Sequence, residues 1–128
     1  MFTGAHFLLY SKDPEADRAF LRDVLKFRAV DAGGGWLIFQ LPPAELGVHP
    51  TMNGDFEQQH AEHNLSGCVL YLMCDDIGAA MKTLAASKVQ CSEVQTAEWG
   101  TKTTFKLPSG GEIGLYQPAH ATAIDLAS

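Results

Sequence analysis

Two stretches of the chain, FQLPPAELGVHP at residues 39–50 and FKLPSGGEIGLYQP at residues 105–118, share one pattern. Each reads phenylalanine, a polar residue, Leu-Pro, a short turn, glutamate, an aliphatic residue, glycine and a second aliphatic residue. Turn residues between two apolar segments predict a β-hairpin. Because the hairpin occurs twice, we expect the domain to contain two copies of one unit.

The repeat continues upstream of both hairpins. GAHFLLY at residues 4–10 and SGCVLYLM at residues 66–73 are short apolar segments typical of strands. Asp13, which Pro14 follows, and Asp76 stand where helix N-caps are expected, and apolar spacing predicts helices at about 13–25 and 76–87. Extended stretches follow each helix, so each unit reads β-α-β-β-β.

These elements predict an α+β fold of two tandem modules. Module 1 covers about residues 1–50 and module 2 about residues 66–118, with a polar linker at 51–65 and a C-terminal tail at 119–128. Side by side, two such modules can form a curved, mixed, eight-stranded sheet around a concave pocket, with the helices outside. GGG at residues 33–35 is expected to join two strands, since no helix follows it as a nucleotide site requires.

The composition is that of an ordinary folded domain. The chain has 128 residues, 46% of them hydrophobic and 19% charged, which is enough for one buried core. It has no membrane-spanning apolar run and no signal-peptide pattern at its start, which predicts a cytoplasmic protein. A net charge of -6 without a Lys/Arg cluster argues against nucleic-acid and membrane partners. The three cysteines lack metal-type spacing and are expected to be reduced thiols.

The repeated units, His6 on the first strand, the Asp-capped helices and the AEWGTKTTFKLPSGGEIGLYQP ending at residues 97–118 resemble the vicinal oxygen chelate superfamily. This group contains glyoxalases, bleomycin-resistance proteins and extradiol dioxygenases, and the resemblance covers essentially the whole chain. It implies that the chain forms a homodimer. The enzymes of the group bind a divalent metal through four ligands, one on the first strand and one on the fourth strand of each module, so the resemblance also implies four ligand slots.

The resemblance places the four ligand slots at His6, Gly47, Val69 and Gly114. Of these, only His6 carries a donor atom, whereas a divalent ion needs several nitrogen or oxygen donors. We therefore expect no metal or other cofactor; the alternative is a bound Zn, Ni, Fe or Mn ion. Val69→His together with Gly114→Glu is expected to restore a metal site.

Glu45 lies two residues before Gly47, and Glu112 lies two residues before Gly114. Residues two apart on a strand point to the same face, so each glutamate is expected to share a face with its ligand slot. The two glutamates are interpreted in three ways: as solvated carboxylates at strand ends, as ligand contacts in the pocket, or as a displaced metal site with His6. His60 and His63, in the linker, are expected to be solvated.

Tyr71, Met73 and Trp99 complete the set of candidate ligand-binding residues, together with His6, Glu45 and Glu112. Aromatic and thioether side chains suit contact with an organic molecule, although both also serve in cores. No catalytic residue can be named from the sequence.

Three functional hypotheses remain open. The favoured one is a metal-free protein that binds a small organic molecule in the concave pocket. The second is a metal-dependent lyase, isomerase or dioxygenase with a non-standard ligand set, and the third is a regulatory or interaction module. A homodimer is expected, and residues 51–65 could allow modules to be exchanged between subunits.

Overall fold

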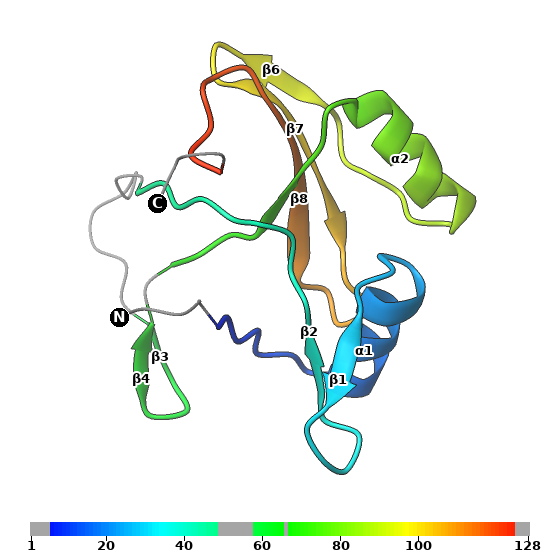
Figure 1. The fold of residues 1–128 in the computed structure, drawn as a ribbon, viewed down its shortest axis with the longest axis vertical. Coiled ribbons are helices and arrows are strands. Elements are labelled where there is room, and N and C mark those ends of the chain that lie inside the picture. The colour runs from blue at the N-terminus through cyan, green and yellow to red at the C-terminus, as the bar shows by residue number, and fades with distance from the viewer. Residues whose placement is uncertain (1–5, 49–57, 66, 125–128) are drawn as a thin grey trace.

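The computed structural model describes residues 6–48, 58–65 and 67–124. In this part of the chain, two helices and three separate antiparallel or mixed sheets form an α+β fold (Figure 1). Helix α1 spans Pro14–Asp23 and helix α2 spans Ile77–Ala86, which confirms both predicted helices. Neither of these helices is long and apolar enough to cross a membrane.

Both helices begin at the aspartates that the sequence indicates. The Asp13 carboxylate accepts a hydrogen bond from the N–H of Ala16 at 3.2 Å, and Asp76 accepts one from Ala79 at 3.1 Å. Each bond satisfies a donor that has no partner inside its helix. Pro14 lies in the first turn of α1, where its missing N–H has no cost.

The largest sheet has four strands and comes entirely from module 2. Its strands are β5 (Tyr71–Met73), β6 (Gln95–Ala97), β7 (Gly100–Lys106) and β8 (Glu112–Pro118), in the order β5-β8-β7-β6. Strand β5 is parallel to β8, and the other pairs are antiparallel. Together with α2, these strands form the β-α-β-β-β unit that the sequence predicts for module 2.

The core lies between this sheet and the two helices, which cover the same side of it (Figure 1). Alternate residues of β7 and β8 face the helices, and these are buried. Helix α1 of module 1 packs on the same core, with the Phe20 and Phe105 rings 6.1 Å apart. The buried hydrophobic side chains are Leu84, Phe105, Leu107, Ile113 and Leu115.

A buried carboxylate joins α1 to the turn between β7 and β8. Asp17 is only 7% exposed. It accepts hydrogen bonds from the Ser109 N–H at 3.0 Å and from the Ser109 hydroxyl at 2.7 Å. These bonds connect residues that are far apart in the sequence and fix the helix of module 1 against the sheet of module 2.

Module 1 differs from its prediction. Strands β1 (Ala29–Asp31) and β2 (Leu37–Phe39) pair as a hairpin, and the glycines at 33–35 form its turn, as expected. The segments at 6–10 and 40–48, however, are irregular, although both were predicted to contain strands. The single eight-stranded sheet is therefore wrong for the described residues.

The turns explain why the two copies of the hairpin differ. In module 2, Gly110 has φ +100, and the Leu107 N–H donates to the Gly111 carbonyl at 2.7 Å. The corresponding turn of module 1 is one residue shorter and reads Pro-Ala at 43–44. It has no glycine for a left-handed position and two backbone N–H groups fewer, because it is one residue shorter and begins with a proline, so it cannot form the same turn.

The linker also differs from its prediction, because its second half forms a hairpin. Strands β3 (Gln58–His60) and β4 (His63–Leu65) are antiparallel, with His60 opposite His63. The polar sequence has no apolar alternation that would have indicated strands. The two histidines are exposed, as expected, and His60 packs edge-on against Tyr10 with the ring centroids 4.4 Å apart. Residues 51–57 lie outside the described part of the chain.

Candidate functional site

The candidate site lies on the face of the four-stranded sheet that points away from the helices. Register pairs Tyr71 with Gly114 across β5 and β8, and Lys102 with Tyr116 across β7 and β8. These residues alternate with buried core residues such as Leu115, so they share the opposite face. Met73 also pairs with Tyr116 and belongs to this face.

Two aromatic side chains, Tyr71 and Trp99, lie there beside a third, Tyr116. Its ring centroid lies 5.9 Å from that of Tyr71 and 6.1 Å from that of Trp99. The Tyr116 hydroxyl donates a hydrogen bond to the Trp99 carbonyl at 2.8 Å, which fixes the end of β8 against the turn before β7. Trp99 remains 38% exposed, so part of its ring is open to a ligand. We call Tyr71, Trp99, Lys102 and Tyr116 the aromatic face.

Gly114 lies beneath the Tyr71 ring. Its φ is not positive, so its backbone conformation would accept other residues. A Cβ atom at this position, however, would overlap the ring carbons of Tyr71. The glycine therefore allows the tyrosine to lie flat across the neighbouring strand, which is the close approach that a missing side chain permits.

Lys102 brings a positive charge to the aromatic face. Its Nζ lies 5.2 Å from the centroid of the Trp99 ring and 5.9 Å from that of Tyr71. Both distances fall within the range of cation–π contact. Among the residues that the structure describes, Lys102 has no carboxylate oxygen within 4.0 Å.

The local environment favours the neutral forms of the Tyr116 phenol on the aromatic face and the Cys74 thiol beside it. Burial, the Glu45 carboxylate and Tyr71 raise the pKa of the Tyr116 phenol. Burial raises the pKa of the Cys74 thiol, and Asp75 and Asp76 raise it further. A thiol and a phenol with raised pKa values are poor bases and poor nucleophiles at neutral pH.

The predicted site residues fall into two groups. Tyr71, Met73 and Trp99 lie together on or beside the aromatic face. Glu45 acts on it from the first module, because its charge contributes to the raised pKa of Tyr116. Its carboxylate also accepts a hydrogen bond from the Ala123 N–H at 2.6 Å, near the C-terminal end of the described chain.

His6 and Glu112 do not join this group. His6 is exposed in an irregular segment. Glu112 is exposed at the beginning of β8, four residues before Tyr116, and its register partner is Lys106. Four residues along a strand correspond to about 13 Å, so Glu112 stands at the other end of the sheet face.

Sequence reasoning missed Lys102, Tyr116 and His120. The His120 and Tyr116 ring centroids are 5.6 Å apart, which extends the aromatic cluster toward the C-terminal segment. Tyr116 and Lys102 could have been found from the predicted hairpin, because period-two alternation from the apolar core positions of β7 and β8 places both on the opposite face. Their pairing across the strands needed the register, which the sequence does not give.

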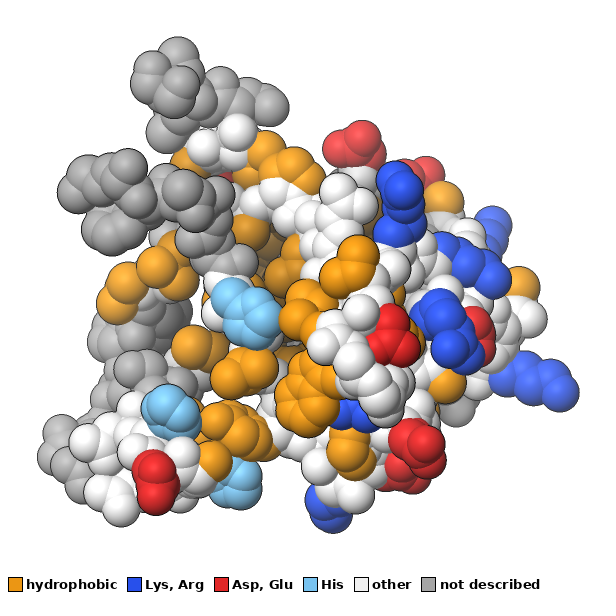
Figure 2. All heavy atoms as spheres, turned by 60° about the horizontal axis from the view of Figure 1, so that its bottom comes forward, with side chains coloured by type: hydrophobic (Ala, Val, Ile, Leu, Met, Phe, Trp, Pro, Cys, Tyr) orange, Lys and Arg blue, Asp and Glu red, His pale blue; other side chains and the backbone are white. Residues whose placement is uncertain are grey.

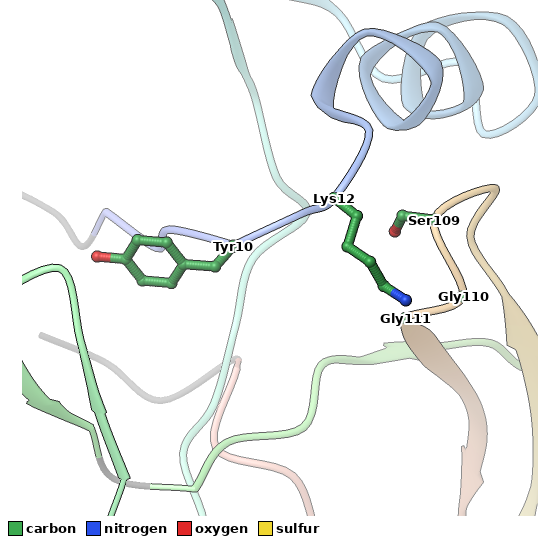
Figure 3. Close-up of a pocket in the computed structure, with 5 residues that line it drawn as sticks. All are labelled: Tyr10, Lys12, Ser109, Gly110 and Gly111. Carbon is green, nitrogen blue, oxygen red and sulfur yellow. The ribbon is translucent and has the colours of Figure 1, made fainter.

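The surface has one hollow at the turn between β7 and β8 and another beside the aromatic face. The first, about 310 Å³, is lined by Tyr10, Lys12 and the turn at 109–111. Figure 3 shows Lys12 reaching toward this turn while the Tyr10 ring points away from it. The second, about 270 Å³, includes Met73 and Cys74 at the end of β5. Met73 therefore connects the second hollow with the aromatic face.

The slots implied for a metal do not provide a donor set. Gly47 and Gly114 have no side chain, and Val69 is aliphatic and 65% exposed. Within residues 6–48, 58–65 and 67–124, no group of three His, Cys, Asp or Glu side chains is placed to hold an ion. The Tyr71 ring fills the space next to Gly114, where a ligand side chain would have to lie.

Comparison with known proteins identifies the family. The model of the Glyoxalase/Bleomycin resistance protein/Dioxygenase superfamily matches residues 4–115, and the chain belongs to this superfamily. The resemblance inferred from the duplicated hairpin is thereby confirmed. A comparison with curated protein sequences gives no significant match.

Solved structures support the same fold. TnmS3, an antibiotic binding protein from Streptomyces sp. CB03234, has a TM-score of 0.61 at 25% identity, covering 93% of this chain and 99% of its own. A lactoylglutathione lyase from Agrobacterium tumefaciens has a TM-score of 0.60 at 15% identity, covering 90% and 92%. A glyoxalase/bleomycin resistance protein from Streptomyces sp. CB03234 has a TM-score of 0.52 at 24% identity, covering 84% and 93%.

Proposed function

We propose that the protein binds a small, planar organic molecule on the aromatic face of its four-stranded sheet, without a resident metal. The observation that carries this proposal is the cluster of Tyr71, Trp99 and Tyr116 on the side of the sheet away from the core, with Trp99 partly open. Aromatic side chains offer planar molecules a large apolar contact area. The fold likeness to an antibiotic binding protein supports a binding role.

The chemistry of the face favours binding over catalysis. Tyr116 and Cys74 keep their protons at neutral pH, since their pKa values are raised further above ordinary values that already lie above neutrality. The implied metal slots contribute glycine and valine in place of donors, so no step can be assigned to a polarised ligand oxygen. A binding protein requires only the rings and the space beside them.

Binding can be measured through Trp99. The chain has two tryptophans, so Trp36→Phe leaves Trp99 as the only one. We expect 4-nitrobenzamide, a neutral planar quencher, to quench this tryptophan with saturation at about 0.1–1 mM, as fits a fragment-sized ligand. Tyr116→Ala should weaken the affinity about tenfold, because it removes the central ring of the cluster.

The reciprocal variant, Trp99→Phe, reports Trp36 and supplies the collisional baseline for the same titration. Tyr10→Ala is the matched aromatic control, because Tyr10 is exposed and belongs to the hollow at residues 109–111. It should leave the affinity unchanged. Linear quenching without saturation, or an equal loss in Tyr10→Ala, would place binding elsewhere or exclude it.

We also propose that the chain pairs with a second copy of itself. Phe7, Leu8, Leu9 and Tyr10 form an extended apolar segment in which every side chain is at least 46% exposed. Figure 2 shows hydrophobic side chains gathered between the histidines and the side of the molecule that carries most of the Lys, Arg, Asp and Glu side chains. Contiguous exposed apolar side chains of this kind mark a protein contact surface.

The internal repeat indicates what covers this segment. Its counterpart in module 2 contains β5, which pairs with β8, whereas the segments at 6–10 and 40–48 are unpaired within the described chain. Within residues 6–48, 58–65 and 67–124, strand β5 pairs on one edge only, with β8. Extended apolar segments and a strand edge without a partner among these residues are complementary, so a second copy can pair with both.

Light scattering tests the assembly. At micromolar concentration we expect a species of twice the chain mass of 13.9 kDa. Leu8→Asp should shift it to the monomer, because a carboxylate would be buried in the contact. Val94→Asp is the matched control, an exposed aliphatic residue next to β6 that should leave the mass unchanged. A wild-type monomer at these concentrations would refute the dimer.

A further inference from the structure

The aromatic face carries one positive charge, and this charge indicates which ligands it selects. Lys102 lies between two rings, 5.2 Å from the centroid of Trp99 and 5.9 Å from that of Tyr71. It extends from the middle of β7 opposite Tyr116, so its position is set by the strand register. We propose that Lys102 makes the site selective for planar aromatic ligands that carry an acidic group, a proposal that rests on the binding function above.

The Lys102 ammonium group is held in place by the two rings but is not neutralised by them. Aromatic rings attract a cation through their quadrupole but carry no net negative charge. Among the described residues, no carboxylate oxygen lies within 4.0 Å of Lys102. A carboxylate, sulfonate or acidic phenolate of a ligand can therefore complete the pair.

The acidic groups near Lys102 do not pair with it. The Glu45 carboxylate acts on Tyr116 and accepts a hydrogen bond from the Ala123 N–H at 2.6 Å, but among the described residues it does not lie within 4.0 Å of the Lys102 ammonium. The Tyr116 phenol donates its proton to the Trp99 carbonyl and has a raised pKa, so it is neutral. Lys102 thus provides the charge on this face that is free to meet a ligand.

The position of Lys102 allows one ligand to contact both the charge and the rings. Because Lys102 touches both Trp99 and Tyr71, a ligand whose acidic group reaches the ammonium brings its ring against the same side chains. Charge and stacking then act on one molecule. The Arg18–Trp36 pair offers a useful contrast: its cation lies 4.9 Å from one ring centroid, but the ring belongs to module 1, outside the cluster around Tyr116.

Three quenchers of equal size separate charge from stacking in the Trp36→Phe protein: 4-nitrobenzoate, 4-nitrobenzamide and 4-nitrobenzylammonium. We expect the anion to bind about five- to tenfold more tightly than the amide, and the cation to bind more weakly than both, as for one partly exposed ion pair. Lys102→Met should abolish this order while leaving the amide affinity within about twofold. Lys102→Arg should retain the order, because it keeps the charge.

Lys106→Met is the matched control, since Lys106 lies on the same strand and the same face, opposite Glu112. It should preserve the preference for the anion. Equal affinity for all three quenchers in the Trp36→Phe protein, with and without Lys102→Met, would overturn charge selection and leave the binding function intact. Absence of saturable quenching by the neutral amide would instead overturn the binding function, and the selectivity with it. Thermal melts of each variant confirm that it is folded.

Discussion

Gly114→Glu is expected to lower the free energy of unfolding by about 3 kcal/mol or more. The added Cβ would overlap the Tyr71 ring, and Gly114 itself is buried, so the longer glutamate side chain would have to displace the ring. Overpacking alone costs about 1–3 kcal/mol, and an unpaired polar group adds to it. Urea denaturation, followed by far-ultraviolet circular dichroism, measures the change.

The internal repeat supplies the control for this experiment. Gly47 is the counterpart of Gly114 in module 1, and a Cβ at Gly47 would meet no atom within 4 Å. Gly47→Glu should therefore change the stability by less than about 0.5 kcal/mol. Removing the ring with Tyr71→Ser should recover much of the loss in Gly114→Glu. Equal costs at the two glycines, or no recovery, would show that the ring does not exclude the side chain.

The same overlap revises the expectation that Val69→His with Gly114→Glu would restore a metal site. The glutamate cannot enter its slot while the Tyr71 ring lies over Gly114. We therefore expect no tight divalent-ion binding by this double variant unless Tyr71 is also reduced in size. The glycine that was interpreted as a lost metal ligand serves, in the structure, to seat an aromatic ring.

Asp17→Ala is expected to cost about 2–3 kcal/mol of stability. Its carboxylate accepts hydrogen bonds from the Ser109 N–H and hydroxyl, at 3.0 Å and 2.7 Å. Hydrogen bonds to a charged group contribute about 1.5–3 kcal/mol, and the variant also leaves the Ser109 donors without this partner. Denaturant unfolding monitored by circular dichroism provides the measurement.

Asp23→Ala is the matched control on the same helix. Asp23 is exposed. Within the described chain, its carboxylate bonds only to the neighbouring Arg22. Such surface pairs contribute little, so this variant should change stability by less than about 0.5 kcal/mol. Ser109→Ala should fall between the two, because it removes the hydroxyl bond and keeps the N–H bond. If Asp17→Ala costs no more than Asp23→Ala, the contact between α1 and the turn is not stabilising.

Local sequence was sufficient to predict both helices and most of module 2. Asp13 and Asp76 cap their helices as their side-chain chemistry indicates. Glycines at 110 and 111 specify a tight hairpin between two apolar segments, and β7 and β8 form there. The same reasoning failed for module 1, where the shorter Pro-Ala turn leaves the segment at 40–48 irregular.

The sequence by itself predicted both helices, the β-α-β-β-β unit at residues 71–118, the superfamily and the kinds of side chain available for a site. Only the tertiary structure decided which of those side chains meet. Tyr71 lies over Gly114, Lys102 lies beside Trp99, and Asp17 reaches Ser109, because strand register and helix packing join distant segments. A local pattern fixes which face a residue occupies, but its neighbours on that face depend on the alignment of strands, and a shift of one residue would exchange them all.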